Sequence, residues 1–403
     1  MNMQSLKKNL NDTLLSLPFI FSFAFIIFFE GSSKVLVITT LLSLLCYVVV
    51  FRQKATSFII KNIRQPFHIL LWVFALFVFF QAWLNGVASR EIRTILCLSL
   101  IALYFPFLAI RSYLYQIMII LGCCSVFINS AYFNIYLGLS RKSGVINSIP
   151  YAGIAALLAL WAIHFSLSSQ NKRTKVFFGF LSILPMISLA LTQSRGVWIA
   201  FLCALVVLTW RQYKLNVKKT LILGVSIIVA TFMFSNSFIE KRIEKTQYEF
   251  EQIRQGNMNT SIGLRLQMWE ASLKLADGNW WLGLGKRHYS KLDQLYKQHE
   301  ISKSLFRFNP AHYHNQFIDS IVKSGIIGLF FLLLLFLLPL YLVRTSDKNT
   351  KNMVRAVIIL YIIMGLTDVP FYNGQTFILY VFTILILLGR NNQPENQNIF
   401  KVS

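Results

Sequence analysis

The sequence is poor in charged residues, and most of all in acidic ones. Only 13% of its 403 residues are charged, with 15 Asp and Glu against 39 Lys and Arg, while 56% are hydrophobic. Soluble domains carry about 25% charged residues, so this composition excludes an ordinary soluble protein and predicts an integral membrane protein. The net charge of +24 does not indicate a nucleic-acid partner, because the basic residues are spread over many short loops, as membrane topology requires.

Several motifs that carry chemistry are also missing. All five cysteines fall inside hydrophobic segments and none has the spacing of a metal site, so neither a disulfide nor a zinc site is expected. The chain has no Asp-x-Asp, no HExxH and no Walker loop, which argues against metal-assisted sugar transfer and ATP chemistry. The glycine-rich GLGKRHY at 283–289 has no strand before it. We therefore expect no metal and no cofactor.

Long hydrophobic segments fill most of the chain. They run to roughly 15–27 residues, against the ~20 that a helix needs to cross the bilayer, and they do not alternate in polarity as barrel strands would. Helices must do the spanning, because each segment has to satisfy its own backbone hydrogen bonds. Twelve spans are predicted, at residues 14–30, 33–51, 66–84, 93–110, 113–130, 150–168, 176–192, 197–211, 220–236, 316–342, 355–370 and 374–389.

Basic loops orient these spans. Clusters of Lys and Arg on alternate loops place both termini in the cytoplasm by the positive-inside rule, and the long loop on the opposite, periplasmic side of a bacterial inner membrane. The N-terminal segment lacks a small-residue cleavage site and is read as a retained first span. The predicted fold class is an all-α polytopic membrane protein of about twelve transmembrane helices. It divides into spans 1–9 (residues 1–236), a large helical periplasmic loop (237–315), and spans 10–12 with a cytoplasmic tail (316–403).

Residues 236–315 form the only long polar passage. Within it, 262–276 predict an amphipathic helix with Ser261 as N-cap, and 239–255 predict a second helix. One apolar face of the first helix is expected to dock the loop as a lid over a site at the membrane mouth. That face consists of Ile262, Leu266, Trp269 and Leu273.

Three arginines are candidates for an anion site. Arg195 lies in the short break TQSRG, on the side where topology disfavours positive charge, and its neighbours Ser194 and Gly196 offer small groups and backbone donors. Arg265 lies on the 262–276 helix, and two guanidiniums form a natural clamp for a pyrophosphate. Arg141 lies on the same side and would widen the site. Against this, an arginine at a membrane mouth is often only an anchor, and one on a helix surface is often only solvated.

The segment AHYHNQF, directly before a predicted span, supplies candidates for a base. A neutral imidazole of His314 or His312 would take a proton from a sugar hydroxyl, and Asn315 follows at once. A lone interfacial histidine is more often a structural group, but two histidines and an asparagine in four residues favour a site.

Two acids lie close to these segments. Asp319 follows Asn315 by about one turn and is expected to pair with Lys323 at i,i+4 rather than to orient the site. Asp368, at the outer end of the predicted eleventh span, is a functional candidate because acids at such depths are costly.

Three patches together resemble the bacterial O-antigen ligases and their relatives, the O-antigen polymerase-like membrane glycosyltransferases. They are TQSRGVW before a span, Arg265-x-x-x-Trp269 followed by Gly283-x-Gly285, and His314-Asn315 before the next span. Their order around one large loop carries the resemblance. The chain departs from the family where an Asn-Pro-Asn-like patch is frequent and this sequence has NSIP at 147–150.

The resemblance implies an inner-membrane enzyme with a GT-C-type architecture. It would move O-antigen from undecaprenyl pyrophosphate to a sugar of the lipid A-core, without a metal. By the same resemblance, Arg195 and Arg265 would hold the pyrophosphate and His314 would serve the acceptor hydroxyl, with His312 a second candidate. The implied partners are the carrier-linked O-antigen, the lipid A-core and membrane lipids.

Two other functions stay open on the sequence. An O-antigen polymerase would use the same donor and extend a second carrier-linked chain. A transporter of this size usually shows two matching halves of six spans, whereas the polar insertion here falls between the predicted ninth and tenth spans.

Overall fold

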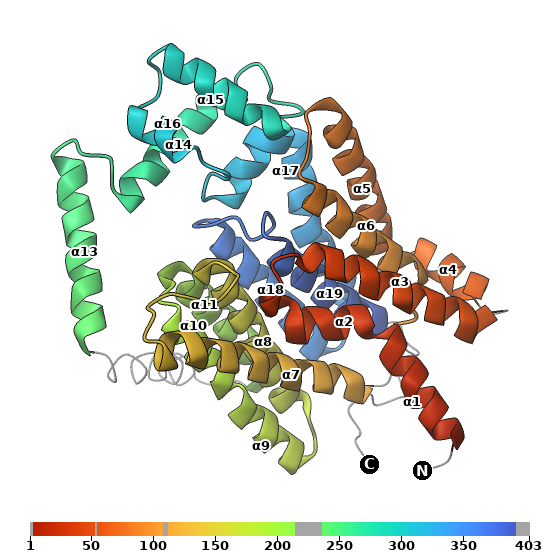
Figure 1. Cartoon of the computed structure of the whole chain (residues 1–403). Coiled ribbons are helices and arrows are strands. Elements are labelled where there is room, and N and C mark those ends of the chain that lie inside the picture. Colours follow the sequence, from red (N-terminus) through yellow and green to blue (C-terminus); the bar gives the residue numbers. More distant parts are fainter. Residues whose placement is uncertain (1–2, 53–54, 108–111, 214–235, 392–403) are drawn as a thin grey trace.

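The computed structural model describes residues 3–52, 55–107, 112–213 and 236–391, and in these ranges all regular structure is helical, with no strand. Figure 1 shows one helical bundle with a smaller group of helices above it. The all-α part of the predicted fold class is therefore confirmed.

The helices fall into four successive groups along the chain. The first contains α1 (Met3–Leu15), α2 (Leu17–Ile20), η1 (Phe21–Phe25), η2 (Ile26–Phe28), α3 (Ser32–Phe51), α4 (Ala55–Ile63), α5 (Pro66–Leu84) and α6 (Ser89–Tyr104). The second contains α7 (Ser112–Ser130), η4 (Ala131–Tyr136), α8 (Ser148–Ser168), α9 (Lys172–Leu181), α10 (Ile183–Leu191) and α11 (Arg195–Tyr213). The polar passage forms α13 (Asn236–Arg254), α14 (Ser261–Ala276), η5 (Gly285–Arg287), α15 (His288–Lys297) and α16 (Lys303–Phe308). The last group contains α17 (Gln316–Leu342), η6 (Val343–Thr345), α18 (Lys348–Gly365) and α19 (Gly374–Asn391).

Six helical segments of the described chain are long and apolar enough to cross a membrane. They are Ser32–Phe51, Pro66–Leu84, Ser112–Tyr136, Ser148–Ser168, Lys172–Leu191 and Gln316–Thr345. Asn9–Leu15 and Leu17–Phe28 make a seventh only if counted as one span, because they are bent by 61°. The chain is thus an α-helical membrane protein.

The count of twelve stays a prediction. The predicted spans at 197–211 and 374–389 correspond to shorter apolar helices, Arg195–Thr209 and Gly374–Gly389. Those at 93–110 and 355–370 correspond to α6 and α18, which do not reach the same length and apolarity. The predicted span at 220–236 lies almost wholly outside the described residues.

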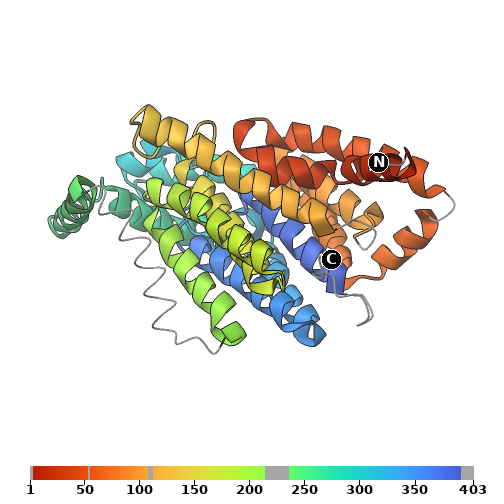
Figure 2. The ribbon, with the colours of Figure 1, turned by 90° about the horizontal axis from the view of Figure 1, so that it is seen from below.

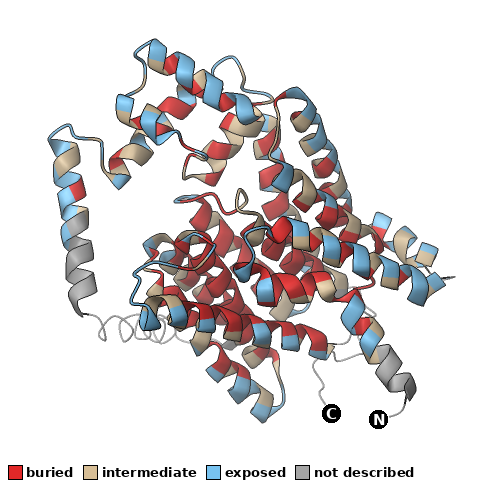
Figure 3. Ribbon diagram, in the orientation of Figure 1, coloured by how far each residue is buried: buried red, intermediate tan, exposed pale blue. Residues whose placement is uncertain are grey.

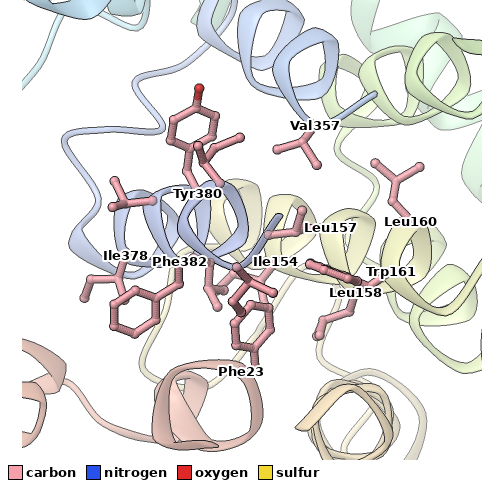
Figure 4. Close-up of a cluster of buried hydrophobic side chains, with 14 of the residues drawn as sticks. Phe23, Ile154, Leu157, Leu158, Leu160, Trp161, Val357, Ile378, Tyr380 and Phe382 are labelled. Carbon is pink, nitrogen blue, oxygen red and sulfur yellow. The ribbon is translucent and has the colours of Figure 1, made fainter. Parts of the chain in front are cut away.

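The centre of the bundle is α8, which is buried on nearly all sides (Figure 3). Its sequence AGIAALLALWA has no polar face, as expected for a helix surrounded by others. Small side chains along it let neighbouring helices approach closely. Figure 4 shows Ile154, Leu157 and Trp161 of α8 among Phe23 of η1 and Phe382 of α19. The core therefore joins both ends of the sequence.

The helices of the polar passage have a small core of their own. Met268 and Leu275 of α14 pack there with Leu292, Leu305 and Tyr313. The helix α13 stands at the edge of the molecule in both ribbon views (Figure 1, Figure 2). The predicted helix at 239–255 is confirmed by α13, and that at 262–276 by α14.

Two details predicted for α14 are wrong. Its N-cap is Thr260, whose hydroxyl accepts a hydrogen bond from the Gly263 N–H at 3.0 Å. Its docking face is also different in part: Trp269 packs against the small core as predicted, but Leu266 and Leu273 are 39% and 65% exposed. The side facing the core instead carries the buried Met268 and Leu275.

The segment from Trp280 to Gly285 fills a break in α17. Gly325 interrupts that helix with φ 67°. The amides of the two residues after the break donate instead to the carbonyls of Trp280 (2.8 Å) and Trp281 (3.3 Å). In return, the N–H of Leu284 donates to the carbonyl of Val322 at 2.8 Å. A break in a helix at a membrane mouth is tolerated when other protein groups satisfy its backbone, as this segment does.

The Gly-x-Gly turn at 283 and 285 is what lets the segment fit. Gly283 has φ 64°, and a Cβ there would lie 2.5 Å from the Ser324 nitrogen. A Cβ on Gly285 would lie 2.6 Å from Asn85 Cβ, and the Asn85 amide donates to the Gly283 carbonyl at 3.0 Å. These glycines therefore serve close backbone packing between α17 and the end of α5.

Gly283→Ala is expected to lower the melting temperature of the purified protein far more than Gly278→Ala. Both glycines have positive φ, 64° and 73°, so each alanine adds left-handed strain of about 1 kcal/mol. Only at Gly283 does the added methyl group also meet backbone, since Gly278 has open space around it. Thermal unfolding in detergent measures both shifts. Equal shifts for the two variants would show that the close approach at Gly283 does not matter.

Candidate functional site

Three arginines from distant segments converge at one place. Arg195 begins α11, Arg265 lies on α14, and Arg141 lies in the turn between η4 and α8. Partial burial, together with the positive charges of Arg195 and Arg265, lowers the pKa of Arg141. Within the described part of the chain, no carboxylate forms a salt bridge with any of the three. Clustered guanidiniums without a counterion form a site for an anion.

The neighbours of Arg195 hold the turn together. The Arg195 guanidinium donates to Thr246 Oγ1 at 2.6 Å, which ties the start of α11 to α13. The buried Ser194 hydroxyl is directed to the Thr192 carbonyl at 3.5 Å. A Cβ on Gly196 would lie 2.5 Å from Thr367 Oγ1, so this glycine lets α11 pack against the end of α18. No contact assigns Ser194 or Gly196 to an anion, and their predicted binding role stays a prediction.

His314 lies against a carboxylate. Its Nδ1 is 3.3 Å from Asp368 Oδ1, and the Asp368 side chain is almost fully buried. The His314 backbone N–H donates to His312 Nδ1 at 3.4 Å, and the two imidazole rings are 4.4 Å apart. Burial, above all, lowers the pKa of His312 and keeps that ring neutral. His314 itself has φ 49°, a left-handed conformation that a histidine rarely adopts and that often marks a functional residue.

Asn315 has a structural place beside them. Its side chain caps α17 by accepting from the amides of Phe317 (3.0 Å) and Ile318 (3.2 Å). Its Nδ2 donates to the Leu366 carbonyl at 3.4 Å. The cap therefore fixes the start of α17 directly after His314 and next to the Asp368 turn.

The sequence prediction missed Tyr313, which anchors the histidine segment. The side chain is 0% exposed, and its hydroxyl forms a hydrogen bond with His288 Nδ1 at 3.0 Å. Its backbone N–H donates to Asp319 at 3.2 Å, and its carbonyl accepts from Trp269 Nε1 at 3.0 Å. The available signal was the alternation His-Tyr-His, since successive residues of an extended segment face opposite sides. The predicted pairing of Asp319 is confirmed, with Lys323 at 3.0 Å.

Stability is expected to fall below pH 6.5 because of His288. Burial lowers the pKa of His288 to about 3, against about 6.5 in the unfolded chain. Between about pH 3 and pH 6.5, the His288 side chain therefore binds a proton in the unfolded state but not in the folded state. At pH 5 the loss amounts to about 2 kcal/mol. Melting temperatures at pH 7 and pH 5 measure it, and His288→Gln, which cannot protonate, is expected to show a smaller drop. A drop of the same size in that variant would assign the effect to other groups.

The side chains of His312, His314 and Asp368 could also form a metal site. Ligand atoms of His312, His314 and Asp368 lie within 4.8 Å of one another. Two imidazoles and one carboxylate are ligands that zinc accepts. The geometry is thus compatible with either a carboxylate-oriented base or a bound ion.

The arginine cluster and the histidine segment adjoin. Thr367, which touches Gly196, immediately precedes Asp368, which touches His314. One end of the site is therefore cationic, and the other carries an imidazole beside a carboxylate. Of the predicted residues, the structure brings Arg141, Arg195 and Arg265 together, and it joins His312, His314 and Asp368 in a second group.

Comparisons with known proteins agree with this arrangement. Residues 180–333 match the family model described as O-Antigen ligase, and this range contains Arg195, Arg265 and His314. An O-antigen ligase of Escherichia coli strain K12 is 24% identical over 293 residues, 71% of this chain and 67% of that protein. An uncharacterized protein of Haemophilus influenzae is 27% identical over 393 residues, 92% of this chain and 95% of that protein. On this match and these similarities, the chain resembles the O-antigen ligase family, most directly over residues 180–333.

Proposed function

We propose that this protein transfers O-antigen polysaccharide from undecaprenyl pyrophosphate to a sugar of the lipid A-core, with inversion and without a metal. The observation that carries the proposal is the cluster of three arginines, which no carboxylate of the described residues pairs with, adjoining an imidazole whose Nδ1 lies 3.3 Å from a buried carboxylate. A lipid pyrophosphate is an anion and a good leaving group. The site therefore has to supply mainly cations and one base.

In this mechanism the arginines hold the pyrophosphate. Arg195 and Arg265 would bind its oxygens, with Arg141 beside them. The bond between the anomeric carbon and the pyrophosphate oxygen breaks in the reaction, and negative charge grows on that oxygen. Guanidiniums already fixed around it stabilise that charge, since fixed donors need not reorganise during the reaction.

His314 would act as the base. Asp368 Oδ1 lies 3.3 Å from His314 Nδ1, so a proton on Nδ1 would face the carboxylate, and Nε2 would keep a lone pair for the proton of the acceptor hydroxyl. As that proton leaves, the hydroxyl oxygen forms the new bond to the anomeric carbon. Asp368 then stabilises the imidazolium and acts as a positioning residue. His312 is the less suitable base because its Nδ1 already accepts from the His314 amide and burial keeps the ring from protonating.

The location of the site suits two lipid-linked substrates. Trp83 and Trp281 are 80% and 70% exposed on two segments joined by the Gln81–Leu282 hydrogen bond. Exposed tryptophans close to one another on the surface of a membrane protein are typical of the membrane interface. The proposal therefore includes a GT-C-type enzyme of the bacterial inner membrane, with its site on the periplasmic side and both termini in the cytoplasm.

Purified full-length protein in proteoliposomes tests the function. Carrier-linked O-antigen and lipid A-core are supplied with and without EDTA, and the products are separated on gels. We expect a ladder of glycan on the lipid A-core that EDTA does not change. Loss of the ladder in EDTA, restored by a divalent ion, would instead assign the two histidines and Asp368 to a metal.

An O-antigen polymerase is the runner-up, since the family similarity does not distinguish the two acceptors. A parallel reaction with a second carrier-linked repeat as the sole acceptor decides between them. Lengthened carrier-linked chains in that reaction, with no product on the lipid A-core, would make the protein a polymerase.

A further inference from the structure

A cavity lies next to the histidine segment. It has a volume of about 140 Å³, well above the roughly 10–15 Å³ that one water needs. Helices α5, α6 and α17 and the start of α19 line it. One part of the lining is polar and belongs to the ends of α6 and α17 that face the loop. It consists of Arg90, Glu91, Thr94, Gln316, Asp319, Ser320, Lys323 and Ser324.

The cavity continues the row of site residues away from the arginines. Gly196, the residue after Arg195, lies against Thr367 of the Asp368 turn. Asp368 lies against His314, and the His314 ring lies against His312. The His312 ring in turn lies 5.3 Å from the ring of Tyr372, which lines the cavity. The imidazoles therefore stand between the cationic cluster and this space.

Two polar groups in the cavity, the buried Thr94 hydroxyl and the half-buried Glu91 carboxylate, have no hydrogen-bond partner among the described residues. Thr94 is 2% exposed, yet its hydroxyl has no hydrogen-bond partner among the described residues. No described residue forms a hydrogen bond or salt bridge with the Glu91 carboxylate either, and burial, above all, raises the pKa of that carboxyl. Buried polar groups are normally satisfied, so orphaned ones in a cavity point to a bound molecule.

The mixed charge of the lining selects the class of molecule. Arg90 and Lys323 flank Tyr372 at 4.4 and 4.3 Å, but the carboxylates of Glu91 and Asp319 lie in the same lining. Carboxylates repel a phosphate or another polyanion. A sugar ring, whose hydroxyls both donate and accept hydrogen bonds, matches acids and cations together. The arginine cluster, which has no paired carboxylate, has the opposite character.

We propose that this cavity binds the acceptor sugar that carries the attacking hydroxyl, with Glu91, Thr94 and Arg90 as its hydrogen-bonding partners. The inference rests on the proposed function. In an inverting transfer the hydroxyl and its base approach from the face opposite to the leaving group, and the cavity lies beyond the base from the arginines. The floor of the cavity, which includes Phe74 and Leu332, is apolar.

Initial rates in proteoliposomes, with each substrate varied in turn, test the inference on Glu91→Gln and Thr94→Val. Each variant is expected to raise the KM for lipid A-core roughly 10-fold, as the loss of one hydrogen bond to a buried polar group predicts. The KM for the carrier-linked donor stays unchanged. Matched controls are Glu30→Gln, an exposed acid, and Thr39→Val, whose hydroxyl bonds to its own helix. Both controls are expected to behave as wild type.

Equilibrium binding of labelled lipid A-core to the full chain in nanodiscs gives a readout that does not need turnover. We expect the two cavity variants to weaken binding by the same factor as they raise KM. An unchanged acceptor KM, a raised donor KM, or equal weakening for lipid A without core sugars would each overturn the inference. Wild-type protein that transfers no glycan at all would instead overturn the proposed function.

Discussion

His314→Ala is expected to lower the rate of glycan transfer by about 10²–10⁴-fold, the usual contribution of a general base. The variant loses the imidazole whose Nδ1 lies 3.3 Å from the Asp368 carboxylate. Its fold is expected to hold, because Tyr313 rather than His314 fixes the segment in the small core. Rates are measured in proteoliposomes at matched protein levels.

Two further variants make that result specific. His299→Asn changes an exposed histidine of the same helical group, at a left-handed position that asparagine tolerates, and should transfer at the wild-type rate. Asp368→Asn keeps the volume but removes the negative charge 3.3 Å from His314 Nδ1, so we expect a smaller loss of transfer rate. Wild-type activity in His314→Ala would remove His314 from its role, and the same assay on His312→Ala would then decide the base.

Arg265→Ala and Arg195→Ala are each expected to lower transfer by about 10²–10³-fold, the effect of losing one fixed donor at a developing oxyanion. The guanidiniums act as one clamp, so the double variant should lose far less than the product of the two single losses. Lysine at either position should restore little, because a point charge does not reproduce a two-pronged contact.

The control for the arginine series is Arg307→Ala, which removes an exposed arginine from α16. It changes the net charge by the same amount but lies on the other side of the small core. Equal losses in Arg307→Ala and Arg265→Ala would mean that overall charge, not the cluster, drives donor binding. Full ladders from either site variant would remove that arginine from the proposed clamp.

Much of the fold followed from periodicity and composition, and its failures have physical reasons. Helices at 239–255 and 262–276 were predicted because their apolar spacing is local. The docking face of the second was not, since 262, 266, 269 and 273 have the same spacing as 264, 268, 271 and 275. Which of the two apolar faces is buried depends on the helices that pack against α14. In the structure they bury the face that includes Met268 and Leu275. The bend in the first span, by contrast, has a local signal, since Pro18 stands at the start of the helix that follows the break.

The site was predictable residue by residue but not as a set of contacts. Arg195, Arg265 and His314 stand in short patches that a reader of the sequence can find. The contact between Asp368 and His314 joins positions 54 residues apart, and that between Gly196 and Thr367 joins positions 171 apart. No local pattern encodes such pairings. Tyr313 was missed because a buried aromatic between two histidines looks like any interfacial tyrosine until its partners His288 and Trp269 are in place.

The break at Gly325 has a consequence for the order in which the protein is made. When α17 enters the bilayer, the amides just after the break have no partner in their own helix and need the carbonyls of Trp280 and Trp281. Those tryptophans precede α17 in the chain, so the ribosome has already released them when the helix inserts. The carbonyls that accept hydrogen bonds from the amides after the break can therefore already be present when α17 inserts. A circular permutation that places Trp280 to Gly285 after α17 would leave the amides behind the break without hydrogen-bond acceptors during insertion.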